Sequence, residues 1–133
     1  AQEDPPHPLP QYLWWPMRLS GGVARRRRDG HVCIDFKDDS ETALARPYVI
    51  FEDKLWKMWF AYKSQKYRIG YAESIDGIDW IRRDELAGID VGNTGFDDDM
   101  IEYAAVVRYN DQHFMFYNGN NYGVDGIGLA VEK

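Results

Sequence analysis

Acidic residues in the last third of the chain have the spacing that acid–base chemistry requires. Glu102 stands at the start of an expected strand, and Asp97, Asp98 and Asp99 lie in the loop that leads into it. Two carboxyl groups about 5 to 9.5 Å apart, one of them protonated, are the arrangement that cleaves glycosidic bonds. Glu102 is the better candidate for the acid, because close like charges and partial burial would raise its pKa. The alternative is a solvated acidic loop that binds nothing, since acidic runs usually face water.

Arg46 and Asn120 could hold a polar ligand by hydrogen bonds. Arg46 precedes Pro47 at the start of an expected strand, where a guanidinium could bind a sugar hydroxyl or a carboxylate with paired donors. Its alternative role is a salt bridge to the loop of Asp97 to Asp99. Asn120 belongs to the run Asn118 to Asn121, which could bond hydroxyl groups from an exposed loop, although a turn is the simpler interpretation.

Tyr48, Tyr103 and Tyr122 are the aromatic residues best placed to stack on a sugar ring, because they stand near strand starts or in a loop. Most other aromatic residues alternate along the expected strands, and such residues usually pack between sheets. The sequence therefore predicts ligand contacts for Tyr48 and Tyr103, together with Arg46 and Asn120.

Short strands must position these side chains. From His31 onward, β-branched and aromatic runs alternate with turns that contain Asx and Gly residues, a pattern typical of antiparallel hairpins. The two longest stretches that could be helical, about Asp84–Ala87 and Phe96–Met100, are one turn each and too short to stand alone. The predicted fold class is all-β. The expected strands are Val32–Phe36, Pro47–Phe51, Leu55–Tyr62, Tyr67–Ser74, Ile78–Arg82, Tyr103–Tyr109, His113–Asn118 and Gly126–Glu132.

The first 30 residues differ from the rest of the chain. Four of the first ten are proline, and they are followed by Trp14-Trp15 and by the basic run Arg25 to Arg28. Proline fixes φ and removes a backbone donor, so this segment is expected to be an extended arm and not a strand or helix. The predicted domains are therefore an arm over residues 1–30 and a folded part over residues 31–133.

Internal repetition groups the expected strands into two units. Val49 and Met58 match Val106 and Met115 at an offset of 57 residues. Further matches are Ile69, Gly70 and Ala72 with Ile127, Gly128 and Ala130 at an offset of 58, and Arg27-Arg28-Asp29 with Arg82-Arg83-Asp84 at an offset of 55. A unit of this length with several short strands has the size and content of one blade of a β-propeller.

The blades are expected over residues 46–83 and 102–132, which predicts two antiparallel four-stranded blade-like sheets of a partial β-propeller. The second blade has only three strands of its own, and Val32–Phe36 belongs to neither blade. As the alternative to association with another chain, this segment could fold back onto Gly126–Glu132 as the missing fourth strand. A closed ring needs roughly four to eight blades. One chain of this length therefore cannot close a propeller.

Ordered motifs from about Val32 to Lys133 resemble a known superfamily. They are Ala45-Arg46-Pro47-Tyr48-Val49, Trp56-Lys57-Met58-Trp59-Phe60, Tyr67-Arg68-Ile69-Gly70-Tyr71, Met100-Ile101-Glu102-Tyr103, Met115-Phe116-Tyr117-Asn118-Gly119-Asn120 and Gly126-Ile127-Gly128-Leu129-Ala130. This set resembles the five-bladed β-propeller glycosidase-like superfamily of arabinanases, invertases and levansucrases. Within that superfamily, it is similar to the C-terminal part of an uncharacterised bacterial branch.

The resemblance implies a truncated, carbohydrate-related protein. Family members are longer, and they combine a carboxylate from an early blade with a second Asp and an acid Glu from other blades. The motifs for the early carboxylates have no match here, so we expect saccharide binding, with hydrolysis only in an oligomer that assembles enough blades. The alternative is a non-catalytic, oligomerising protein-interaction module that has lost the glycosidase site.

Composition disfavours several other classes. The balance of 16 Lys+Arg against 22 Asp+Glu gives a net charge of −6, which disfavours nucleic acid, and no apolar run approaches the roughly 18 residues of a membrane span. Cys33 is the only cysteine and the three histidines are scattered, so we expect no disulfide, no metal site and no cofactor. The start of the chain lacks the pattern of a secretory signal, so a cytoplasmic location is the default expectation.

The incomplete set of blades predicts a homo-oligomer. Two blades leave flat apolar faces and strand edges that drive association. A two-fold dimer is the simplest form, with sheet faces packed across the interface and the Trp14-Trp15 arm covering apolar surface.

Overall fold

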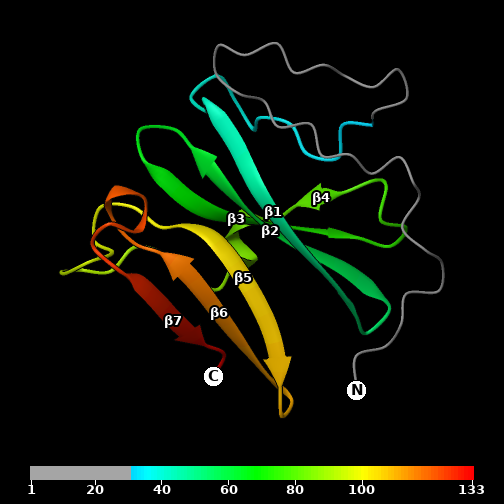
Figure 1. The fold of residues 1–133 in the computed structure, drawn as a ribbon. Coiled ribbons are helices and arrows are strands. Elements are labelled where there is room, and N and C mark those ends of the chain that lie inside the picture. The colour runs from blue at the N-terminus through cyan, green and yellow to red at the C-terminus, as the bar shows by residue number, and fades with distance from the viewer. Residues whose placement is uncertain (1–30) are drawn as a thin grey trace.

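The computed structural model describes residues 31–133, which form two antiparallel sheets (Figure 1). Sheet one has the order β1-β2-β3-β4 and sheet two the order β5-β6-β7. The strands are β1 (Ala43–Glu52), β2 (Leu55–Lys63), β3 (Tyr67–Ser74), β4 (Ile81–Arg82), β5 (Glu102–Tyr109), β6 (Gln112–Asn118) and β7 (Ile127–Val131). The predicted all-β class is confirmed, and the arm predicted for residues 1–30 lies outside the described part.

Two equivalent turns build the sheets as meanders. Asp53 and Lys54 join β1 to β2, and Asn110 and Asp111 join β5 to β6; all four have positive φ, between 49° and 61°. Positive φ at both central residues is the geometry of a type I′ hairpin, whose twist matches that of the flanking strands. Because the two turns are 57 residues apart, they repeat the offset seen in the sequence.

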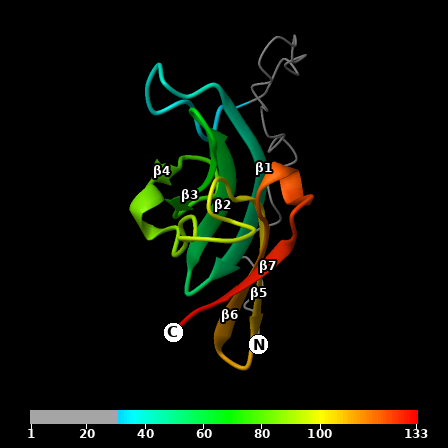
Figure 2. The ribbon, with the colours of Figure 1, turned by 90° about the vertical axis from the view of Figure 1, so that its left-hand side faces the viewer.

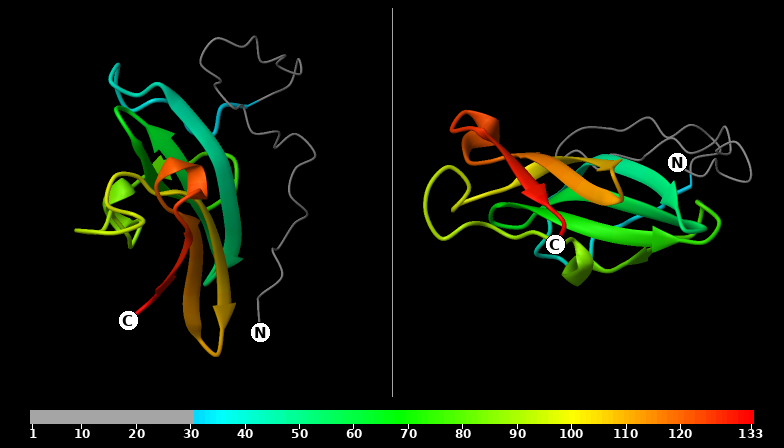
Figure 3. Two further views of the ribbon diagram at one scale, coloured as in Figure 1. Left: turned by 60° about the vertical axis from the view of Figure 1, so that its left-hand side comes forward. Right: turned by 90° about the horizontal axis from the view of Figure 1, so that it is seen from below.

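The sheets pack face to face as two layers, as the view from below shows (Figure 3, right). The core between them contains Trp59 and Tyr71 from sheet one, and Val106 and Met115 from sheet two. The edge strand β5 contacts β1, β2 and β3, and the side view shows it next to sheet one (Figure 2). Residues at the start of β5 are buried against sheet one, and Ile101 and Glu102 are each 0% exposed.

The faces in contact are not equivalent. Sheet two uses its Val106–Met115 face, whose repeat partners in sheet one are Val49 and Met58. Val49 and Met58 lie on the opposite side of sheet one, in a second apolar cluster with Phe60. The sheets are therefore stacked in the same sense, as successive units of a repeat, an arrangement consistent with two blades of a propeller.

The segment Val32–Phe36 is not a strand, contrary to the prediction, and it does not extend sheet two. Its side chains Ile34 and Phe36 pack on the second apolar cluster of sheet one. The Arg82 guanidinium donates to the backbone carbonyl of Asp35 at 3.4 Å. In a sheet, this carbonyl would instead accept a hydrogen bond from the backbone of a neighbouring strand. The burial of Ile34 and Phe36 therefore determines where this segment lies, and its strand propensity does not.

Sheet two has three strands, so the prediction of two four-stranded sheets is wrong for the second. Sheet one does have four, although β4 is shorter than the expected Ile78–Arg82. The Asp76 carboxylate accepts hydrogen bonds from the backbone N–H groups of Ile78 (2.8 Å) and Asp79 (2.9 Å), which holds these residues in a turn.

Helical structure is limited to two 3₁₀ turns among the described residues, at Asp84–Leu86 and Asn121–Gly123. The first lies within the expected helical stretch Asp84–Ala87, whereas the stretch Phe96–Met100 forms no helix. In the described part of the chain, no helix has the length and apolar character to cross a membrane.

Candidate functional site

Matching β-bulges lie near the starts of β1 and β5, the first and edge strands of the two sheets. The pairing register shifts between Ala45 and Tyr48 in β1, and between Glu102 and Ala105 in β5. The bulges place Arg46 (φ 52°) and Tyr103 (φ 58°), two repeat-equivalent residues, in the left-handed region. Non-glycine residues occupy this region at a cost of about 1 to 3 kcal/mol, and such strain is concentrated at functional sites. The bulges therefore indicate a candidate functional site at this end of the sheets.

Glu102 is the buried carboxyl of this end. Its side chain is 0% exposed, and neither carboxylate oxygen has a hydrogen-bond partner. Burial raises the pKa of Glu102 to about 7, against the opposing influence of Arg46, Tyr103 and Lys63. The Tyr103 hydroxyl is close enough to favour the charged form, although its geometry falls short of a hydrogen bond. A carboxyl held near neutral pKa can donate a proton as well as accept one.

Three tyrosine rings that contact one another, and two basic side chains, gather at this end of the sheets beside Glu102. The Tyr67 ring centroid lies 6.5 Å from that of Tyr103 and 5.9 Å from that of Tyr122. Arg46 Cζ lies 4.9 Å from the centroid of the Tyr103 ring, and Lys63 Nζ lies 5.5 Å from that of Tyr67. Burial raises the pKa of Tyr67, and the charge of Glu102 adds to the increase. We call Glu102, Arg46, Lys63, Tyr67, Tyr103 and Tyr122 the Glu102 cluster.

The topology explains why these residues meet. Lys63 ends β2 and Tyr67 begins β3, so both flank the hairpin turn at the end of the sheet where β1 begins. The Ile101 N–H donates to the Tyr67 carbonyl at 3.3 Å, which brings the start of β5 to the same place. Lys63 and Tyr67 were not expected as site residues from the sequence, although their position at a hairpin end was a usable signal.

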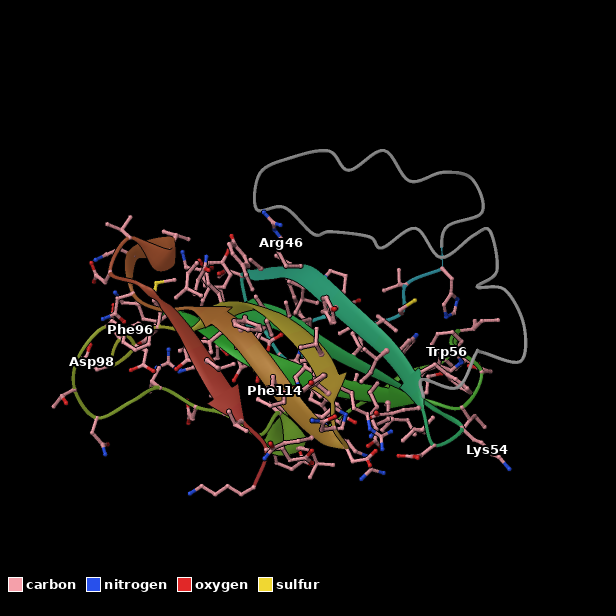
Figure 4. All side chains as sticks on the ribbon, turned by 60° about the horizontal axis from the view of Figure 1, so that its bottom comes forward. Arg46, Lys54, Trp56, Phe96, Asp98 and Phe114 are labelled. Atoms are coloured by element: carbon pink, nitrogen blue, oxygen red, sulfur yellow. The ribbon has the colours of Figure 1, made fainter. Side chains whose placement is uncertain are left out.

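Asp97, Asp98 and Asp99 do not join the cluster. Figure 4 places Asp98 and Phe96 in the loop before β5, away from Arg46. Each carboxylate has its own partner: the hydroxyl of Tyr117 donates to Asp97 at 2.7 Å, Asn120 donates to Asp98 at 2.8 Å and Lys66 pairs with Asp99 at 2.6 Å. Of the two expected causes of a raised pKa for Glu102, burial is present and a like charge from these three residues is not.

Asn120 and Tyr48 have contacts within the protein. The Asn120 side chain is buried, and its Oδ1 accepts from the N–H groups of Asp99 (2.9 Å) and Met100 (3.0 Å) while its Nδ2 donates to the Gly95 carbonyl (3.2 Å). These bonds fix the loop that leads to Glu102. Tyr48 packs against the core between the sheets. Of the predicted residues, the structure brings together Glu102, Arg46 and Tyr103.

A cavity of about 520 Å³ lies elsewhere between the sheets. Its walls include Trp59, Met115, Glu52 and His113. His113 lies between two carboxylates, with Nε2 2.7 Å from Glu52 and Nδ1 2.5 Å from Glu132. Burial alone would lower the pKa of His113, but the hydrogen bonds to both carboxylates outweigh it and raise the pKa. None of the residues of the Glu102 cluster lines this cavity.

Comparisons with known proteins give relatives without a described activity. No model of a protein family matches the sequence. The uncharacterized protein Rv1502 of Mycobacterium tuberculosis strain H37Rv is 42% identical over 110 residues, and MT1551 of strain CDC 1551 is 41% identical over the same length. In both cases the match covers 83% of this chain and 36% of the relative. The chain therefore spans little more than a third of the curated relatives it matches.

Solved structures with a similar fold include a protein described as a glycoside hydrolase. It matches with a TM-score of 0.63 and 16% identity, over 81% of this chain and 32% of its own. A second, described as a BT0996 RGII complex, matches with a TM-score of 0.61 and 18% identity, over 76% of this chain and 35% of its own. The chain thus has a glycosidase-like fold, equivalent to about a third of a glycoside hydrolase structure.

Proposed function

We propose that this chain forms part of a carbohydrate-active β-propeller, in which the Glu102 cluster is a saccharide site. The observation that carries the proposal is the buried carboxyl of Glu102, which has no hydrogen-bond partner and lies near Tyr67 and Tyr103, with the Tyr122 ring packed against Tyr67. The rings offer apolar faces of the kind that sugars stack on, and a ligand that displaced the side chains covering Glu102 would satisfy its oxygens with hydroxyl groups.

The lengths of the relatives support a ring of several blades. Two sheets in 36% of a relative leave room for about five to six in its whole length, which is within the roughly four to eight of closed propellers. The same-sense stacking of the two sheets agrees with successive blades. Glu102 and Arg46 then begin the innermost strands of adjacent blades.

In such a ring Glu102 would act as the general acid. Its pKa of about 7 keeps a large protonated fraction at neutral pH, so the carboxyl can protonate a leaving oxygen. The charges that act on it within residues 31–133 are basic, from Arg46 and Lys63. The second carboxylate of a glycosidase would come from outside these residues, in a longer chain or in a second copy.

Saccharide binding by the full chain tests the proposal. We expect saturation-transfer NMR to detect oligosaccharide contacts, and Tyr67→Ala and Tyr103→Ala to weaken binding about tenfold or more, because each removes a ring of the cluster. Glu85→Gln, on the exposed 3₁₀ turn, is the matched surface control and should bind as the unchanged chain does. A glycan array with no bound saccharide, repeated on every oligomer that the chain forms, would overturn the proposal.

The open face of sheet two supports a second candidate function, a non-catalytic module that binds protein. Val107, Phe116, Leu129 and Val131 lie on this face and are each 43% to 52% exposed. Apolar patches of this kind mark interaction surfaces. A chain that associates through this face, and binds no saccharide in any form, would favour the module over the saccharide site.

A further inference from the structure

The class of saccharide follows from the two basic residues of the Glu102 cluster. Other basic residues in the described strands, namely Lys57, Arg68, Arg82 and Arg108, each form an ion pair with a carboxylate. Within residues 31–133, Arg46 and Lys63 form no ion pair, and each lies against a tyrosine ring. Both positive charges act on the Glu102 carboxyl, but neither forms an ion pair with a carboxylate of the described residues, in a chain whose net charge is −6.

The contact between Arg46 and Tyr103 leaves the binding groups of the guanidinium free. A guanidinium over an aromatic ring is held by the face of the ring and uses none of its N–H groups. These N–H groups form a planar fork that matches the two oxygens of a carboxylate. Burial raises the pKa of Glu102 to about 7, so about half of this carboxyl is neutral near pH 7. The cluster thus carries a net positive charge when it is ready to donate a proton.

We propose that the Glu102 cluster takes saccharides with an anionic group, and that Arg46 and Lys63 bind the carboxylate of a uronic acid residue. This inference rests on the proposed function and adds the substrate class to it. A sulfate ester offers the same charge with tetrahedral geometry, and a sulfated ligand distinguishes it from a carboxylate. Neutral saccharides would leave both positive charges without a counter-ion.

Matched ligands test the inference on the full 133-residue chain. The probes are an oligogalacturonate, the neutral galactose oligosaccharide of the same linkage and length, and its sulfated derivative, measured by calorimetry and saturation-transfer NMR. We expect the uronate to bind about tenfold or more tightly than the neutral sugar, because its carboxylate forms charge-assisted hydrogen bonds with the two basic side chains. High salt should reduce this preference.

Three substitutions assign the preference to residues. Arg46→Gln and Lys63→Gln should each remove most of it, while Lys54→Gln should keep it. Lys54 is a matched control because it stands just beyond β1, at the opposite end of that strand from Arg46 (Figure 4). Circular dichroism of each variant verifies the fold, and the comparison of uronate with neutral sugar on the unchanged chain needs no variant.

The outcomes separate this inference from the proposed function. Equal affinity for uronate and neutral sugar would overturn the inference and leave the saccharide site in place. A tighter complex with the sulfated sugar than with the uronate would overturn the carboxylate assignment. If no saccharide binds, charged or neutral, the proposed function fails and the inference fails with it.

Discussion

Glu102 couples the stability of the protein to the protonation of one buried carboxyl. An ordinary Glu ionises near pH 4.5, whereas burial raises the pKa of Glu102 to about 7. Between these two pH values the unfolded chain has released the proton and the folded chain has kept it. The folded state is therefore destabilised progressively as the pH rises through this window, and the loss is complete above pH 7.

Glu102→Gln should remove this dependence. Because Gln cannot ionise, the variant should gain stability relative to the unchanged chain by about 3 kcal/mol between pH 4.5 and pH 8. Urea unfolding at several pH values measures the difference. A constant difference across this range would show that Glu102 titrates at its ordinary pKa.

His113 is a second titratable residue, and the direction of its effect on stability with pH can be tested. Its raised pKa arises from Glu132 and Glu52, and Lys57 and Arg108 also face Glu52. The stabilisation is complete below the unfolded pKa near 6.5 and is lost as the pH rises through the folded pKa. We expect His113→Gln to lose about 1 to 3 kcal/mol at pH 5.5, and less at pH 9. Chemical denaturation of both proteins checks this, and a larger loss at pH 9 than at pH 5.5 would contradict it.

At the scale of elements, the loop before β5 is fixed to sheet two by close backbone contact. Gly119 begins the turn after β6, and a Cβ added there would clash with the carbonyl oxygen of Phe96. The next residue, Asn120, holds the other end of the same loop. The space at Gly119 is therefore needed for the loop to reach its position beside Glu102.

Gly119→Ala should destabilise the protein by about 2 kcal/mol or more, because backbone must move to admit the methyl group. Gly88→Ala is the control: Gly88 has φ +81° and open space around it, so the cost is conformational strain of about 1 kcal/mol. Thermal unfolding ranks the two variants. A smaller loss for Gly119→Ala than for Gly88→Ala would show that the contact with Phe96 is relaxed in solution.

The bounds of the strands were predicted from the sequence more accurately than the conformation of segments that pair with no strand. Tyr67–Ser74 has the predicted bounds, because a run of alternating aromatic and small residues between polar turns has few other solutions. Val32–Phe36 has a similar pattern but docks its side chains on a sheet, and only tertiary contact decides between these outcomes.

The candidate site was predicted in part, for a related reason. The repeat offset aligned Arg46 with the start of β5, so its proximity to Glu102 followed from register. The partners of Asp97 to Asp99 could not be predicted from register, because the side chains of Tyr117, Asn120 and Lys66 come from distant positions in the chain. Hydrogen bonds within loops depend on geometry that spacing does not encode.

For the whole molecule, the open face of sheet two makes association testable. We infer a homodimer through this face, as the sequence led us to expect. Phe116→Lys should prevent it, because Phe116 is 46% exposed on the face and a buried unpaired charge is costly. Ile75→Lys is the control, since Ile75 is 84% exposed in a turn of sheet one.

Light scattering at micromolar concentrations measures the result. The unchanged chain and Ile75→Lys should have about twice the mass of one 15.5 kDa chain, and Phe116→Lys should have the mass of one. A mass near 15.5 kDa for all three proteins would contradict the dimer.

The meander topology has a consequence for how the chain folds. Every strand pairs with its neighbour in sequence, so each sheet can form from local contacts, which favours rapid folding. All strands of sheet one are synthesised before β5. During translation, its face with Trp59 and Tyr71 therefore stays exposed until sheet two packs on it. Docking of the two sheets should therefore be the slow step. A nascent chain arrested after Arg83 would expose this face and should depend on a chaperone to stay free of aggregates.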